Sequence, residues 1–120
     1  MYCPFCNPTE IVVSNALAYA IYDKYPVSPG HMLIIPKRHV ADFFDTSHEE
    51  RQAIYELMEH CRSRLDKELS PDAYNIGINC GKAAGQMIFH VHAHLIPRYK
   101  GDIDNPRGGV RGVIPDRRVY

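Results

Sequence analysis

Alternation of polar and apolar residues along the segment 87–96 constrains this chain more than any other feature. His90, His92 and His94 fall on one side of an extended strand, and the other side is wholly apolar. A period of two predicts a β-strand here, ended by Pro97, with its apolar side on a helix and successive imidazoles about 6.6 Å apart. The apolar side comprises Met87, Phe89, Val91, Ala93 and Leu95.

The histidine side of this strand has three interpretations. The first is a solvated sheet surface, although the flanking Ile88 and Ile96 indicate that this side is partly covered. The second is a metal site of three histidines. The third is nucleophilic catalysis, in which one imidazole attacks phosphorus while its neighbours fix its tautomer and assist the leaving group. The glycine-bounded loop 81–86 leads directly into the strand and favours the third, because its backbone N–H groups can face an anion.

The rest of the chain predicts a sheet covered by one long helix, which is an α+β architecture. Ser47 and Glu50 form the capping box of a helix, apolar residues recur at helical spacing as far as Leu69, and Pro71 marks the end. This helix is predicted to cover the sheet. Further strands are expected at 11–14, 16–22, 31–35 (ended by Pro36) and 72–79.

Composition and charge restrict the function. The chain has 120 residues with 14 basic and 14 acidic side chains, and its net charge of zero is not that of a duplex nucleic-acid binder. No apolar run is long enough to span a bilayer and no signal peptide is visible, so we expect a cytoplasmic protein without membrane contact. We expect a single domain over 1–120, with an irregular arginine-rich tail, about 101–120, that needs a partner surface or substrate to be ordered.

The four cysteines are not expected to form a disulfide framework in such a chain. Cys61 falls at a core position of the predicted helix, and we assign no role to Cys80. Cys3 and Cys6 can supply two thiolates to one metal ion or act as a redox pair. The redox interpretation is the weaker, because redox C-x-x-C pairs normally follow a strand and open a helix, whereas these two precede every predicted element.

The segment 90–96 matches the signature of the histidine triad family, in which three histidines alternate with apolar residues and two more apolar residues follow. The chain also resembles this family at 29–31, at 33–39 and at Gly85 and Gln86, and the similarity covers nearly all of 3–100. The resemblance implies an α+β domain with a five-stranded antiparallel sheet and one long helix. It also implies a homodimer in which two such sheets form one of ten strands.

The resemblance assigns roles to individual residues. His92 corresponds to the nucleophile that takes up a nucleoside monophosphate as a covalent phosphoramidate, which water then hydrolyses. His94 corresponds to a histidine that hydrogen-bonds phosphate oxygens, and His31 to one that supports the triad. The implied substrate-binding residues are Asp23, for ribose hydroxyls, and Asn79, Gly85 and Gln86, for phosphate.

Two features near the triad indicate the substrate class. Met87 stands where phosphoramidase-type members carry serine, and the segment 97–99 resembles the diadenosine polyphosphate hydrolase and bacterial branches. We therefore expect a nucleotide hydrolase that attacks the α-phosphate of adenosine-containing dinucleoside polyphosphates or of nucleoside phosphoramidates. A nucleotidylyltransferase, or a nucleotide-binding regulatory module with weak turnover, is the alternative.

The resemblance also implies a structural zinc ion. Some bacterial triad proteins, and the related uridylyltransferases, bind zinc through a C-x-x-C pair, a histidine after the third strand and the first triad histidine. Cys3, Cys6, His39 and His90 occupy these positions. Such a set would complete a closed tetrahedral shell without a catalytic role for the metal. The alternative is that both cysteines are free thiols on a mobile terminus.

Overall fold

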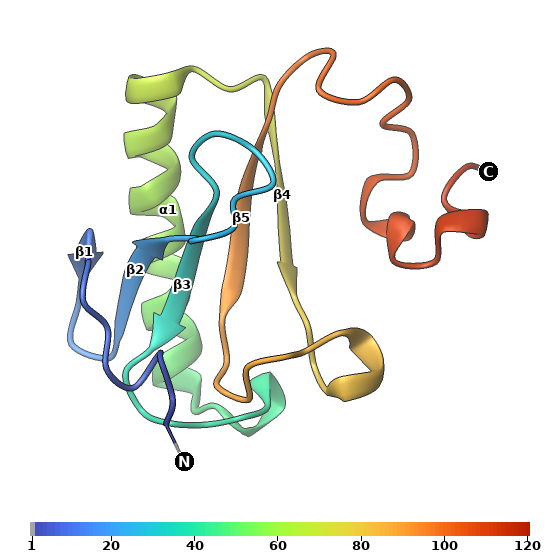
Figure 1. Cartoon of the computed structure of the whole chain (residues 1–120). Coiled ribbons are helices and arrows are strands. Elements are labelled where there is room, and N and C mark those ends of the chain that lie inside the picture. Colours follow the sequence, from blue (N-terminus) through green and yellow to red (C-terminus); the bar gives the residue numbers. More distant parts are fainter. Residues whose placement is uncertain (1) are drawn as a thin grey trace.

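Five antiparallel strands form one sheet in the computed structural model, which describes residues 2–120 (Figure 1). The order across the sheet is β1-β2-β3-β5-β4, so the last strand in the sequence lies between the third and the fourth. The expected five-stranded antiparallel α+β fold is therefore confirmed. The strands are β1 Val13–Ser14, β2 Ala18–Tyr22, β3 Met32–Pro36, β4 Ala73–Ile78 and β5 Ala93–Arg98.

The helix α1 runs from His48 to Leu69 and begins at the predicted capping box. The Ser47 hydroxyl accepts a hydrogen bond from the Glu50 backbone N–H, and the Glu50 carboxylate accepts one from the Ser47 N–H. The helix ends at Ser70, which adopts a left-handed conformation just before Pro71. No helix within residues 2–120 has the length and apolarity needed to cross a bilayer.

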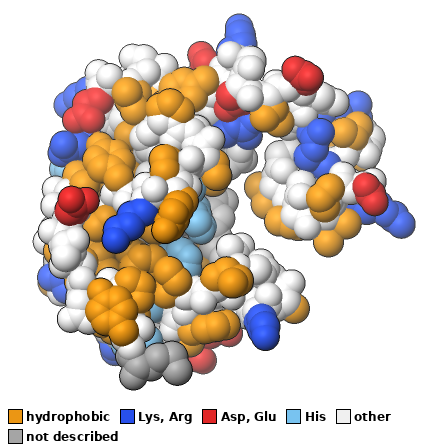
Figure 2. Space-filling model, viewed as in Figure 1, with side chains coloured by type: hydrophobic (Ala, Val, Ile, Leu, Met, Phe, Trp, Pro, Cys, Tyr) orange, Lys and Arg blue, Asp and Glu red, His pale blue; other side chains and the backbone are white. Residues whose placement is uncertain are grey.

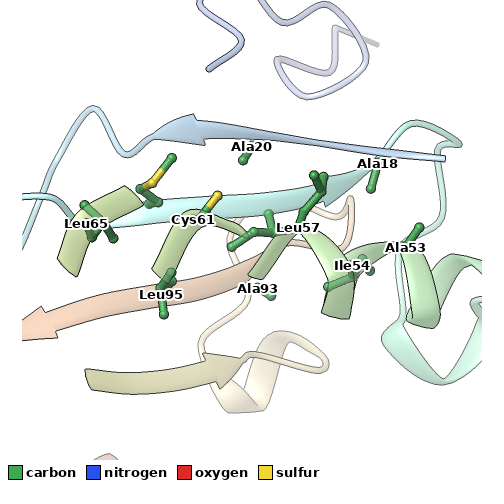
Figure 3. Close-up of a cluster of buried hydrophobic side chains, with 11 residues drawn as sticks. Ala18, Ala20, Ala53, Ile54, Leu57, Cys61, Leu65, Ala93 and Leu95 are labelled. Atoms are coloured by element: carbon green, nitrogen blue, oxygen red, sulfur yellow. The ribbon is translucent and has the colours of Figure 1, made fainter. Parts of the chain in front are cut away.

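One face of the sheet packs on α1 and forms the main core (Figure 3). Small side chains on β2, Ala18 and Ala20, leave room for the helix to approach the sheet. Cys61 is fully buried here, as its position in the helical pattern predicts. The other members of this core are Met32, Ile34, Ala53, Ile54, Leu57, Leu65, Ala93 and Leu95.

A smaller cluster on the opposite face attaches the N-terminal segment to the sheet. Phe5 packs with Tyr19, Leu33 and Ile35, and all four are buried. The Tyr19 hydroxyl also donates a hydrogen bond to the Phe5 carbonyl. Side-chain packing, not strand pairing, therefore positions the chain before β1.

The strand β5 begins later than predicted, at Ala93 and not at residue 87. Met87 and Phe89 do not face the helix but are 83% and 48% exposed. The ladder between β3 and β5 stops at Ile34 and Ala93, because the next residue of β3 that would face β5 is Pro36, which has no N–H. The preceding segment, 87–92, therefore forms a loop.

Both predicted strand-ending prolines lie inside strands. Pro36 closes β3, and Pro97 lies in β5 one residue before its end. The ladder between β3 and β5 runs from the pair Met32 with Leu95 to the pair Ile34 with Ala93. Pro97 lies beyond the first of these pairs and Pro36 beyond the second. The missing N–H therefore breaks no ladder bond. The other predicted strands exist, with ends that differ by at most two residues.

The tail lies beyond β4 and is not irregular throughout (Figure 1). It contains short 3₁₀ helices at Gly109–Val113 and Pro115–Arg117. The guanidinium groups of Arg107 and Arg111 lie 5.2 and 4.6 Å from the ring centre of Tyr120. These two arginines thus stabilise the fold of the tail through contacts within the tail.

Candidate active site

Three histidines from different parts of the fold form the centre of the site. His94 lies on β5 opposite Leu33 of β3, and His31 immediately precedes β3. The Val27 N–H donates to His31 Nδ1 at 3.1 Å, so the ring proton of a neutral His31 is on Nε2. This nitrogen lies 2.9 Å from His94 Nδ1 and donates to it. His94 therefore carries its own proton on Nε2, where it can donate to a ligand.

His92 has the opposite tautomer. Its Nδ1 lies 2.8 Å from the backbone carbonyl of His90, which can only accept, so Nδ1 carries the proton. The lone pair of Nε2 is therefore available for attack on an electrophile. The rings of His92 and His94 are 5.2 Å apart between centroids, so a lone pair and an N–H donor are adjacent. Histidine side chains are visible in the hollow between the main body and the tail (Figure 2).

Burial keeps His31 and His94 neutral. Desolvation lowers the pKa of His94 to about 4, with smaller contributions from His92 and His31. Burial also lowers the pKa of His31, and the carboxylate of Asp23 opposes this shift. His31 and His94 are therefore uncharged at neutral pH, as the hydrogen bond between their rings requires.

Asp23 lies beside the histidines, at the end of β2. Its Oδ2 is 3.4 Å from His31 Nε2, and its Oδ1 accepts a hydrogen bond from the Tyr25 N–H. Asp23, His31 and His94 are close enough to ligate one metal ion, but the hydrogen bonds from Val27 and between the rings already occupy three of the four ring nitrogens. This group is better described as a hydrogen-bonded chain than as a metal centre.

A pocket of about 320 Å³ opens next to Asp23. Its apolar walls are Phe5, Ile21, Leu33 and Ile88, which come from the N-terminal segment, β2, β3 and the loop before β5. Sequence reasoning did not identify this pocket. Two features of the sequence could have indicated its walls: the position of Phe5 between two cysteines and the alternation of apolar residues along β2 and β3. Only the fold brings these residues together.

The glycine-bounded loop lies between β4 and the histidine segment. Gln86 is only 2% exposed, and its amide donates to the carbonyls of Ala41 and Ile88 and accepts from the Gly81 N–H. This side chain braces the loop from within. Gly85 has a φ of 93°, which favours glycine, and its N–H closes a turn onto Lys82. Asn79 follows β4 and is partly buried. Contacts of Asn79, Gly85 and Gln86 with phosphate stay predictions.

The four predicted metal ligands come together. Cys6 Sγ lies 3.2 Å from His39 Nδ1, the two Nδ1 atoms of His39 and His90 are 3.2 Å apart, and His90 Nδ1 lies 3.4 and 3.6 Å from the sulfurs of Cys3 and Cys6. A tetrahedral zinc ion requires about 3.5 Å between sulfur and nitrogen and about 3.3 Å between two nitrogens. His90 Nε2 donates to the Pro36 carbonyl, so its Nδ1 lone pair faces the cysteines. The residues therefore fit a zinc ion.

Comparison with known proteins agrees with this geometry. The sequence model of the HIT domain matches residues 5–101. An uncharacterised HIT-like protein of Saccharolobus solfataricus is 35% identical over 98% of this chain and 89% of its own length. A bis(5'-adenosyl)-triphosphatase of Dictyostelium discoideum is 36% identical over 81% of this chain and 65% of its own length.

A solved structure of similar fold carries a metal. It is a zinc-bound histidine triad family protein of Mycobacterium smegmatis, which superposes with a TM-score of 0.76 at 34% identity, over 83% of this chain and 77% of its own. With a family match over residues 5–101 and the same fold in this structure, the chain belongs to the histidine triad (HIT) family.

Proposed function

We propose that this protein is a nucleotide hydrolase that attacks the α-phosphate of adenosine-containing dinucleoside polyphosphates or of nucleoside phosphoramidates. The observation that carries this proposal is the hydrogen bond from His92 Nδ1 to the His90 carbonyl, which leaves Nε2 of His92 free beside the Nε2–H of His94. The Dictyostelium relative named as a bis(5'-adenosyl)-triphosphatase supports the choice of substrate.

The reaction has two displacements at phosphorus. In the first, His92 Nε2 forms a bond to the α-phosphorus and the bond to the leaving group breaks, which gives a nucleotidyl-histidine. The His90 carbonyl stabilises the positive charge that develops on the ring, because it accepts the Nδ1–H. In the second, water attacks the same phosphorus, the P–N bond breaks, and a nucleoside monophosphate is released. His94 donates its Nε2–H to a phosphate oxygen in both steps.

The surroundings of the histidines fit the remainder of a nucleotide. The apolar pocket beside Asp23 is of a kind that accepts a base, and the carboxylate of Asp23 can accept hydrogen bonds from ribose hydroxyls. The loop that Gln86 braces is assigned to the phosphates, together with Asn79 and Gly85.

We also propose that Cys3, Cys6, His39 and His90 hold a structural zinc ion. The distances among the four ligand atoms support this, as does the zinc-bound relative. A bound zinc ion would be enclosed by these four protein ligands, with no open position for a substrate. A cytoplasmic location is part of the same proposal, because a reducing compartment keeps both thiols available to a metal.

We further propose a homodimer. β4 is an edge strand that pairs only with β5, so two copies can join through it into a sheet of ten strands. Ile76 on this strand is 53% exposed, and Val113 and Ile114 of the tail beyond it are exposed as well.

His92→Ala should reduce hydrolysis of diadenosine tetraphosphate by more than about 10³-fold, because it removes the nucleophile, while AMP binding changes little. Intact-mass measurement should find a nucleotidyl adduct on the wild-type chain and none on the variant. His60→Ala, which changes an exposed histidine of α1, is the matched control. Substantial activity in His92→Ala would contradict the mechanism. An adduct that turns over only with an added acceptor would indicate a transferase, and binding without any adduct a regulatory module.

Acid should destabilise the protein between about pH 6.5 and pH 4, in part through His94. An unfolded histidine takes up a proton below its ordinary pKa of 6.5, whereas the folded His94 resists protonation until its pKa of about 4. The unfolded state therefore binds more protons in this window, and stability falls by up to about 1.4 kcal/mol per pH unit for one such group. His94→Asn keeps a donor and an acceptor but does not titrate. Urea unfolding from pH 4 to 7 should give a shallower slope for this variant, and equal slopes would count against the burial of a neutral His94.

Protein purified without added metal should contain about one zinc ion per chain. Elemental analysis measures this directly. A Cys3→Ser/Cys6→Ser double variant should contain none, because two of the four ligands are lost. Zinc that persists in this double variant would show that the metal lies elsewhere.

Light scattering at micromolar concentration should give twice the mass of one chain. Ile76→Lys should shift the mass towards one chain, because it places a charge at the exposed apolar position of the edge strand. Ile11→Lys alters an apolar side chain of similar exposure before β1, at the other edge of the sheet, and should leave the mass unchanged. A monomeric wild type with full activity would contradict the dimer.

A further inference from the structure

Two of the predicted metal ligands bracket a residue of the nucleoside pocket. Cys3 and Cys6 are separated only by Pro4 and Phe5, and both of these line the pocket beside Asp23. Phe5 is 7% exposed although it belongs to a segment without strand pairing. The position of one pocket wall therefore depends on what holds the two cysteines.

The same phenyl ring contacts the proposed nucleophile. The ring centroid of Phe5 lies 5.0 Å from that of His92 and 6.0 Å from that of His90. Phe5 thus separates the metal-ligating histidine from the pocket and packs against the nucleophile, at distances typical of aromatic pairs.

Apart from the packing of the Phe5 ring on Tyr19, Leu33 and Ile35, few interactions fix this segment. The Cys6 N–H bonds to the Cys3 carbonyl within the turn, and the Tyr19 hydroxyl donates to the Phe5 carbonyl. Ligation by Cys3 and Cys6 would tie both ends of the turn to His39 and His90, which belong to the sheet and its connections. Metal ligation would therefore add a restraint at each end of the turn that carries Phe5.

We propose that the metal-binding turn Cys3–Cys6 is part of the nucleoside-binding machinery, so that metal occupancy controls the affinity for the base of the substrate. The metal places Phe5, and Phe5 in turn acts as a positioning residue for the base and for the ring of His92. The contacts proposed for ribose, from Asp23, and for phosphate, from His94 and the loop 81–86, come from segments other than this turn. This inference rests on the proposed function, because it requires a nucleotide in the pocket.

The experiment compares AMP with ribose 5-phosphate, which has the same ribose and phosphate but no base. Calorimetry should give an AMP affinity about tenfold lower for chelator-treated protein than for zinc-loaded protein, within the range of one aromatic contact to a base. The affinity for ribose 5-phosphate should change by less than about twofold, since no contact to a base is at stake. Addition of zinc should restore the AMP affinity.

Two variants separate the metal from the wall that it holds. His39→Ala removes an exposed ligand that does not line the pocket, and it should reproduce the effect of the chelator, while His60→Ala should not. Phe5→Ala should lose AMP affinity while it retains zinc, and Phe5→Leu should recover part of it because leucine fills much of the same space but lacks the aromatic face. Hydrogen exchange at residues 3–6 should increase in His39→Ala but not in His60→Ala.

Equal AMP affinity of zinc-loaded protein, chelator-treated protein and His39→Ala would overturn this inference and leave the proposed function intact. Parallel losses for AMP and ribose 5-phosphate would also overturn it, because they would indicate general destabilisation. If zinc-loaded wild-type protein binds neither compound, the proposed function fails and the inference fails with it.

Discussion

The buried side chain of His90 is the constraint on which the rest of the site depends. Its Nε2 donates to the carbonyl of Pro36, which fixes the ring and directs Nδ1 towards the cysteines. Its own carbonyl accepts the Nδ1–H of His92 and so fixes the tautomer of the proposed nucleophile. One residue thus connects the end of β3, the proposed metal ligands and the proposed nucleophile. A change at His90 would disturb all three, so His92 and the cysteines are the more informative positions for mutation.

The charge state of the site follows from its burial on the sheet face opposite α1. His31 and His94 are held neutral by burial, and the chain of hydrogen bonds from the Val27 N–H gives each ring one defined tautomer. An ion pair stabilises the connection between β3 and α1, which contains His39. Arg38 donates two hydrogen bonds to Glu50 at the start of α1 and thereby holds the pKa of that carboxyl to about 2. The capping-box glutamate therefore caps the start of the helix and also anchors the segment next to His39, a proposed metal ligand.

Local patterns predicted the elements well but not the contacts between them. The capping box of Ser47 and the signature around His92 each lie within a few consecutive residues, so the sequence alone identified the helix and the triad. The alternation at residues 87–96 predicted too long a strand, because the stop is set by Pro36 on a different strand. The buried bonds of Gln86 and the pocket wall formed by Phe5 likewise depend on segments far apart in the sequence. No local pattern reports such contacts.

The two sides of the site differ in how completely a single chain encloses them. On the side proposed for the nucleoside, the N-terminal segment, β2 and β3 form a walled pocket beside Asp23. On the other side, Met87 directly follows the loop assigned to phosphate and is 83% exposed, and Phe89 is 48% exposed. Discrimination requires contacts that differ between competing ligands. Within the proposed function, the single chain therefore has the means to select the base, whereas selection of the leaving group requires whatever covers residues 87–89, such as the partner copy of a dimer.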